Sequence, residues 1–171
     1  MLITNDDGID CEGLVALAKA LQALRSYEIF ILAPDGNRSG VSNSISLYNP
    51  VRIVKHGKNS WSCSGTPADC AMIATLGALP FKPDIIVSGI NAGPNIGTDL
   101  IYSGTAAAAR QAALHGIPSI AFSLAAHTAP FYWEQTARFI AENLETFLDA
   151  WEPDIFINVN IPNREEGPLG I

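Results

Sequence analysis

The stretch MLITNDDGIDCEGLVALAKALQALRSYEIFILAP (residues 1–34) decides the fold class. Residues 1–4 form a short apolar strand, and leucine and alanine then recur from Leu14 to Leu24 with the spacing of a helix that buries one face. Residues 28–33 form a second buried strand, which Pro34 ends. A strand, a helix and a strand in this order predict a βαβ unit with parallel strands and a right-handed crossover.

The same alternation continues along the chain. Thr66-Pro67-Ala68-Asp69 combines an N-cap residue, a proline at the first helical position and a first-turn acid, so a helix is expected to begin there. Hydrophobic periodicity predicts strands at 84–88, 118–122 and 154–160, helices at 105–115 and 131–151, and an inserted β-hairpin from 44–48 and 51–55. We therefore expect an α/β fold with a mostly parallel sheet, in one domain of residues 1–161 followed by a polar tail of residues 162–171.

Composition limits the classes of partner. The chain has 171 residues, 48% of them hydrophobic, which is enough for one domain with a buried core. Its formal charge of −7 argues against a nucleic acid or an anionic membrane as the main partner, since both require a basic face. The cysteines are Cys11, Cys63 and Cys70, an odd number without metal-ligand spacing, so we expect reduced thiols and a cytoplasmic protein. The sequence contains no run of 18 apolar residues, so it predicts no membrane span.

Two adjacent acids, Asp6 and Asp7, follow the first strand directly. Side chains alternate along a strand, so both carboxylates can reach one ligand only if the backbone turns, and Gly8 permits that turn. Two close carboxylates also repel each other unless a cation neutralises them, which suggests a divalent metal ion. The alternative is that the two acids cap the helix that follows.

The polar segments after three strands provide only oxygen ligands. They are Asn5–Asp7, Asn37–Ser42 and Ser88–Gly97, and the carboxyl ends of parallel strands meet in one crevice. Carboxylate, hydroxyl and amide oxygens suit Mg²⁺, Mn²⁺ or Ca²⁺ better than zinc. The histidines His56, His115 and His127 have no partner at ligand spacing and are interpreted as surface or core residues.

A helix start at Ser103-Gly104-Thr105 offers free backbone N–H groups that could seat a phosphate. Simple capping explains Ser103 and Thr105 equally well. Arg38 adds a cation to the second loop, although a solvated loop arginine is the ordinary alternative. The uncharged loop of residues 88–97 is rich in amides and suits close approach to an anion, but its glycines match neither a dinucleotide fingerprint nor a P-loop.

Several linked motifs, taken together and in this order, resemble the SurE survival-protein family of metal-dependent nucleotidases. They are Asn5–Gly8, Ala33–Asp35, Arg38-Ser39, Ser64–Cys70, Ser88–Asn95, Ser103–Thr105 and Asn158–Pro162. The resemblance implies a Rossmann-like, three-layer α/β/α core. It also implies one divalent ion per subunit, Mg²⁺ or Mn²⁺ with Ca²⁺ as a further option, held by Asp6, Asp7, Ser39 and Asn91.

The resemblance further implies hydrolysis of nucleoside 5′- and 3′-monophosphates, activity of some members on short polyphosphate, and assembly into homodimers or homotetramers. Family members usually continue well beyond the position that matches Ile171, so residues 162–171 are expected to be the start of a longer extension.

We accordingly expect a phosphomonoesterase in which Asp6 or Asp7 orients the attacking water. Hydrogen bonds to the phosphate are expected from five residues, Asn5, Asn95, Ser103, Gly104 and Thr105. One rival is covalent catalysis through either acid. The other is a metal-dependent nucleotide-binding or stress-sensing module without turnover. Stacking of Trp61, Tyr102 or Trp133 on a base, against plain packing, is left open.

Overall fold

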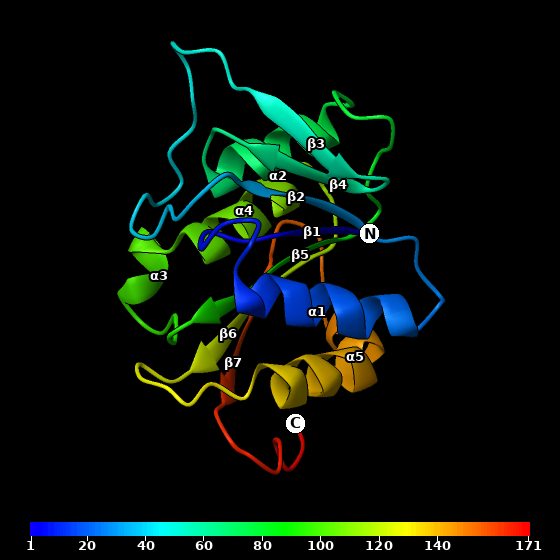
Figure 1. Ribbon diagram of the computed structural model, residues 1–171, viewed down its shortest axis with the longest axis vertical. Coiled ribbons are helices and arrows are strands. Elements are labelled where there is room, and N and C mark those ends of the chain that lie inside the picture. Colours follow the sequence, from blue (N-terminus) through cyan, green and yellow to red (C-terminus); the bar gives the residue numbers. More distant parts are fainter.

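One sheet of seven strands runs through the molecule in the order β3-β4-β2-β1-β5-β6-β7, and only β3 is antiparallel to its neighbour (Figure 1). The structure is a computed structural model that describes residues 1–171. The strands are β1 (Leu2–Thr4), β2 (Phe30–Pro34), β3 (Ile53–Gly57), β4 (Ser60–Cys63), β5 (Ile86–Ala92), β6 (Ser119–Ala125) and β7 (Ile157–Pro162). The helices are α1 (Glu12–Ala23), α2 (Pro67–Thr75), α3 (Asp99–Tyr102), α4 (Gly104–Ala113) and α5 (Trp133–Asp149).

Neighbouring side chains on the central strands pack into two separate hydrophobic cores, one on each face of the sheet. On β1, Leu2 packs with α2 and α4, whereas Ile3 packs with α1 and α5, and both side chains are fully buried. The same alternation separates Ile86 from Val87 on β5. Because successive strand side chains point to opposite faces, a strand covered on both sides needs apolar residues for both, as Leu2-Ile3 and Ile86-Val87 provide here. The result is the expected three-layer α/β/α arrangement.

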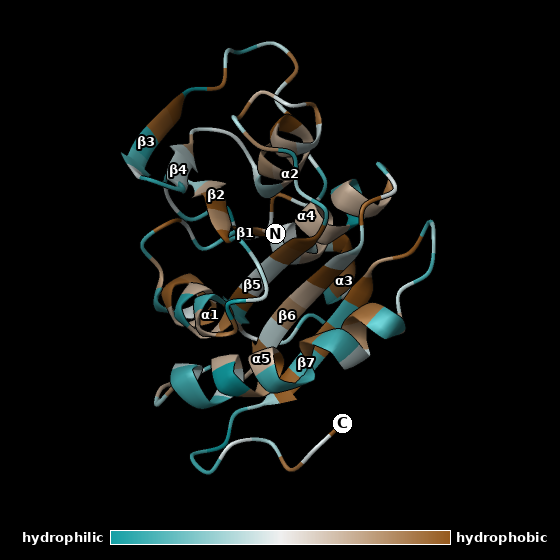
Figure 2. Cartoon of the chain, turned by 90° about the vertical axis from the view of Figure 1, so that its right-hand side faces the viewer, coloured by the Kyte–Doolittle hydropathy of each residue, from teal (hydrophilic) through white to brown (hydrophobic).

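The outer helices are amphipathic in the way the periodicity predicts. α5 buries Ile140, Leu144 and Phe147 against the sheet and turns hydrophilic residues outward, which appear teal in Figure 2. Phe147 meets Phe122 of β6 edge to face with ring centroids 5.5 Å apart. None of the helices combines the length and the apolar character that crossing a membrane requires.

The structure confirms the predicted α/β class and most elements, and it corrects one. The inserted hairpin is formed by β3 and β4, joined at Lys58-Asn59, and residues 44–48 are not a strand. Trp61 explains the shift, since it is only 6% exposed and gives β4 a buried side chain, whereas Leu47 and Tyr48 are largely exposed. The short helix α3 is an element that the periodicity did not predict.

The topology places one crevice at the carboxyl ends of β1 and β5. From β1 the chain builds outward through β2 to β4 and β3, and it then returns to β5 on the other side of β1. Such a reversal of strand order is the switch point at which open α/β sheets bind ligands. A ligand site is therefore expected between the segments that follow β1 and β5.

Candidate functional site

A polar cavity of about 210 Å³ opens at this switch point. Asp6 comes from the turn after β1, Ser39 from the loop after β2, Asn91 from β5, and Asn95 and Ser103 from the segments around α3. The structure thus brings together three of the four predicted metal ligands and two of the five predicted phosphate contacts. Two further lining residues, Asp99 and Tyr102, belong to α3. Asp99 was not predicted, because without α3 nothing in the sequence connects it to the other strand ends.

Asp6 is seated on the N-terminus of α4. Its carboxylate is almost completely buried, and its Oδ1 accepts a hydrogen bond from the Thr105 hydroxyl. Burial raises the pKa of Asp6, and this outweighs the opposing effect of the Thr105 hydroxyl and of the N–H groups of Thr105 and Gly104. A Cβ on Gly104 would lie 2.7 Å from the Asp6 Cβ, so only glycine allows this approach. The acid therefore does not cap the following helix, whose N-cap is Cys11.

Asp7 lies beside the cavity and is half-buried. Its Oδ1 accepts from Asn37 Nδ2 at 3.2 Å, and its Oδ2 accepts from the backbone N–H of Ala92 at 3.4 Å. Burial, followed by the negative charge of Asp6, raises the pKa of Asp7 to about 6. The ion pairs of the molecule involve neither acid. Two adjacent carboxylates without a compensating cation fit the requirement for a bound divalent ion.

The neutral members of the predicted set also fit a hard cation. Asn91 donates from Nδ2 to the carbonyl of Gly93 at 2.8 Å, which leaves its Oδ1 available as a ligand. Ser39 is exposed, and its backbone N–H donates to Asn37 Oδ1 at 2.9 Å. No group of three or more His, Cys, Asp or Glu side chains is placed to hold a metal ion. A cation at this position would consequently need Ser39 and Asn91 in addition to the two acids.

The predicted phosphate contacts divide into two groups. Asn95 and Ser103 line the cavity, whereas the side chain of Asn5 is buried in the turn after β1, where it bonds both the N–H and the carbonyl of Gly8. The Thr105 hydroxyl donates to Asp6 Oδ1, and the N–H groups of Gly104 and Thr105 lie close enough to the Asp6 carboxylate to oppose the rise of its pKa. The contacts of Asn5, Gly104 and Thr105 with the phosphate therefore stay predictions. Ser103 is also the N-cap of α4, since its Oγ accepts from the N–H of Ala106.

Of the remaining candidates, all but Tyr102 lie outside the cavity. Arg38 pairs with Asp35 of its own loop at 2.7 Å and donates to the carbonyl of Ser64, which follows β4. No histidine lines the cavity. Of the three aromatic candidates, only Tyr102 does, and it is 63% exposed. The three cysteines are free thiols, as expected.

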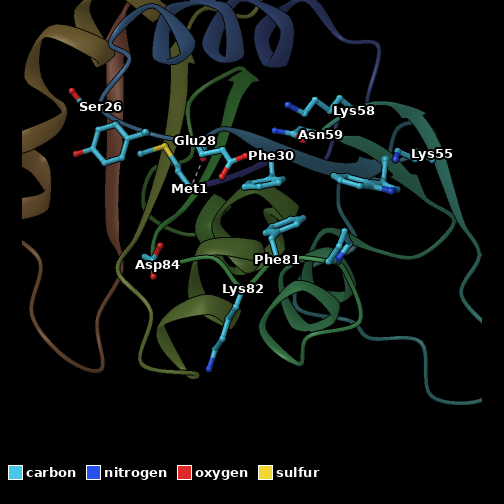
Figure 3. A pocket seen from close by; sticks show the side chains of 13 residues that line it. Met1, Ser26, Glu28, Phe30, Lys55, Lys58, Asn59, Phe81, Lys82 and Asp84 are labelled. Carbon is cyan, nitrogen blue, oxygen red and sulfur yellow. Dashed lines mark hydrogen bonds between the residues drawn. The ribbon is translucent and has the colours of Figure 1, made fainter.

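A larger cavity of about 560 Å³ lies at the opposite, amino ends of the strands (Figure 3). Its lining includes Met1, Phe30 and Asp84, which lie at the amino ends of β1, β2 and β5. Phe30 and Phe81 stack on one another with ring centroids 3.8 Å apart and make up part of its wall. None of the predicted metal or phosphate residues reaches it, so size is a poor guide to the site in this fold. The position at the strand ends decides in favour of the smaller cavity.

The two acids predict how metal binding depends on pH. A carboxyl group whose folded-state pKa lies above its unfolded value of 3.8 binds more protons when folded, so the metal-free protein should lose stability as the pH rises through about 6. A cation must displace those protons. We expect Mn²⁺ to raise the melting temperature more at about pH 7.5 than at about pH 5. Thermal melts with and without Mn²⁺ measure this, and equal shifts at both pH values would contradict the metal site.

Comparisons with known proteins all find the same family. The family described as "Survival protein SurE" matches residues 1–170. The chain is 43% identical over 164 residues to the 5′-nucleotidase SurE of Geotalea daltonii, covering 95% of this chain and 65% of that protein. It is 42% identical over 185 residues to the 5′-nucleotidase SurE of Prochlorococcus marinus, covering 99% of this chain and 66% of that protein.

The crystal structure of the SurE protein from Aquifex aeolicus superposes with a TM-score of 0.87 at 38% sequence identity, over 96% of this chain and 66% of that one. The chain therefore spans about two thirds of the length of the relatives it matches. Because the family match covers nearly every residue and the fold agrees, the resemblance seen in the motifs is confirmed, and the chain belongs to the SurE family.

Proposed function

We propose that this chain carries the site of a divalent-metal-dependent phosphomonoesterase that hydrolyses nucleoside 5′- and 3′-monophosphates, and also short polyphosphate. One observation supports this most directly. Oxygen ligands from Asp6, Ser39 and Asn91 and hydrogen-bond donors from Asn95 and Ser103 line the same cavity. Ligands for a hard cation next to donors for a phosphate are what phosphate ester hydrolysis requires. The printed names of the relatives, 5′-nucleotidase SurE, point to the same reaction.

The metal ion would be held by Asp6, Asp7, Ser39 and Asn91. When bound, a divalent ion supplies positive charge that stabilises the phosphoryl oxygens and makes a nearby water more acidic. Mg²⁺ and Mn²⁺ both suit these oxygen ligands.

The protein's own groups then orient the reactants. Asp6 or Asp7 orients the attacking water as a hydrogen-bond acceptor. The second N–H of the Asn95 amide and the Ser103 hydroxyl donate to the phosphate oxygens as charge develops on them. Each such donor contributes about 3 kcal/mol to lowering the barrier.

Tyr102 is the aromatic side chain best placed to contact the base. It is exposed, it lines the cavity, and it belongs to α3, next to Ser103. A stacked ring tolerates any base, because every base has a π-face. This contact would favour nucleotides over phosphate esters without an aromatic ring.

The proposal includes a cytoplasmic location and assembly of identical chains. Assembly is supported by large apolar side chains that are exposed on the loop between β2 and β3. Leu47 is 70% exposed and Tyr48 is 95% exposed. Apolar side chains exposed together are typical of surfaces that contact another chain.

The test is release of inorganic phosphate from a panel of nucleoside 5′- and 3′-monophosphates. The protein is first treated with a chelator and then assayed with Mg²⁺, with Mn²⁺ or without metal, and the variants Asp7→Asn and Asn91→Ala are assayed in parallel. We expect metal-restored release in the wild type and a loss of at least about 100-fold in both variants. A folded wild type that binds nucleotide but releases no phosphate with either ion would instead support the binding or stress-sensing module. A trapped phosphoenzyme would support the covalent route.

A further inference from the structure

The backbone of Asn95 is held by two asparagines of the edge strand β7. Its N–H donates to Asn160 Oδ1 at 2.8 Å, and its carbonyl accepts from Asn160 Nδ2 at 3.1 Å. The same carbonyl also accepts from Asn158 Nδ2 at 3.0 Å. The backbone N–H and the carbonyl of Asn95 are therefore both hydrogen-bonded to side chains that lie more than sixty positions away in the sequence.

Asn95 needs such partners because of its place in the chain. It lies between β5 and α3, in residues 93–98, which belong to no helix or strand, so no ladder fixes its backbone. The Asn160 amide offers one acceptor and one donor, as a peptide of a neighbouring strand would. On the side-chain end, Asn95 Nδ2 donates to Ser123 Oγ at 2.8 Å, and both groups are buried. Asn95 lines the cavity, and this bond leaves its second amide N–H and its Oδ1 available to a ligand.

Asn158 carries a buried polar atom that lowers stability and that the fold does not require. Its Nδ2 bonds Asn95, but its Oδ1 is buried without any partner. An unpaired buried polar atom is unfavourable, and an apolar side chain on this strand would avoid it. Positions at which a chain departs from local stability are expected at functional sites.

We propose that Asn158 and Asn160 are positioning residues, which fix the peptide of Asn95 so that its side chain is presented to the phosphate. They touch neither substrate nor metal. The inference rests on the proposed phosphate contact of Asn95, and it adds β7 to the set of elements that build the site.

The chain contains a matched control. Asn163, the first residue after β7, accepts from the N–H of Tyr132 at 3.0 Å through Oδ1 and donates to the carbonyl of Pro130 at 2.8 Å through Nδ2. It therefore makes the same pair of backbone hydrogen bonds as Asn160, but to the loop before α5, which does not line the cavity. Alanine at either position removes one bond of each kind.

The experiment compares Asn158→Ala, Asn160→Ala and Asn163→Ala in thermal melts and in phosphate release from AMP with Mn²⁺. Hydrogen exchange of the Asn95 amide is measured in the same proteins. We expect Asn160→Ala and Asn163→Ala to lower the melting temperature similarly. Only Asn160→Ala should lose protection at Asn95 and lower kcat/KM by at least about 10-fold, with Asn158→Ala intermediate. Asn163→Ala should keep kcat/KM within about 2-fold.

The outcomes separate this inference from the proposed function. Equal kcat/KM in Asn160→Ala and Asn163→Ala, in an active wild type, would overturn the positioning role and leave the phosphatase intact. A wild type that releases no phosphate would overturn the proposed function, and the positioning role with it. Unchanged exchange at Asn95 in Asn160→Ala would overturn the positioning role whatever the activity.

Discussion

The variant Asp6→Asn is expected to lower phosphate release by about 1000-fold or more and to abolish stabilisation by Mn²⁺. Asp6 is the only one of the two predicted acidic ligands that lines the cavity, together with Ser39 and Asn91, so we expect its charge to be the main attraction for a cation there. The asparagine keeps one oxygen that can accept from the Thr105 hydroxyl and from the α4 N-terminus. Because burial already disfavours the ionised form, loss of the charge should leave the melting temperature of the metal-free protein nearly unchanged.

The control for this variant is Asp10→Asn, which removes the same charge from an exposed acid four residues further along the chain. Activity and Mn²⁺ stabilisation should both survive there. Substantial phosphate release by Asp6→Asn at saturating metal would show that the cation does not depend on this carboxylate.

The second large effect is expected for Gly104→Ala. The added Cβ would lie 2.7 Å from the Asp6 Cβ, 3.0 Å from Asp6 Oδ2 and 3.1 Å from the ring of Pro67, so α4 and the acid must move apart. Overpacking of this kind costs about 1–3 kcal/mol of stability. A displacement of the acid by about 1 Å lowers kcat by about 100-fold. Thermal melts and phosphate release measure the two effects.

Gly57→Ala is the matched control, since a Cβ there meets nothing closer than 3.9 Å and the residue has no left-handed backbone conformation. It should leave both quantities unchanged. If Gly104→Ala retained full activity, the contact between α4 and Asp6 would not be needed for the reaction.

The layers of the fold could be predicted because they depend on local patterns. The leucines of α1 recur with the helical period, and β2, β5 and β6 are short, largely apolar segments. Thr66 with Asp69 forms the capping box at the start of α2. The hairpin was misplaced because Ser44–Tyr48 alternates as a strand does, and nothing local shows that the partner of β3 is instead the strand carrying Trp61.

The residues that meet at the cavity could also be predicted, but their hydrogen-bond partners could not. Asp6, Ser39 and Asn91 could be grouped from the rule that strand ends converge. The hydrogen bond between Asp6 and Thr105 joins residues 99 positions apart, and nothing in the sequence around Thr105 indicates it. The bonds of the Asn5 side chain to Gly8 could not be predicted either, because an asparagine that closes a turn and one that binds an anion have the same sequence context.

The bonds that join Asp6 to α4 and Asn95 to β7 have a consequence for synthesis of the protein. The cavity draws on the first strand, on helix α4 and on a strand that ends at Pro162, so its geometry depends on pairings of very large sequence separation. Contacts of this kind form late, after the loops between them have closed. A nascent chain gains the site only once β7 has left the ribosome and paired with β6. A growing chain that has not yet reached Pro162 therefore contains Asp6 and Asp7 but lacks the strand that fixes the backbone of Asn95 beside them.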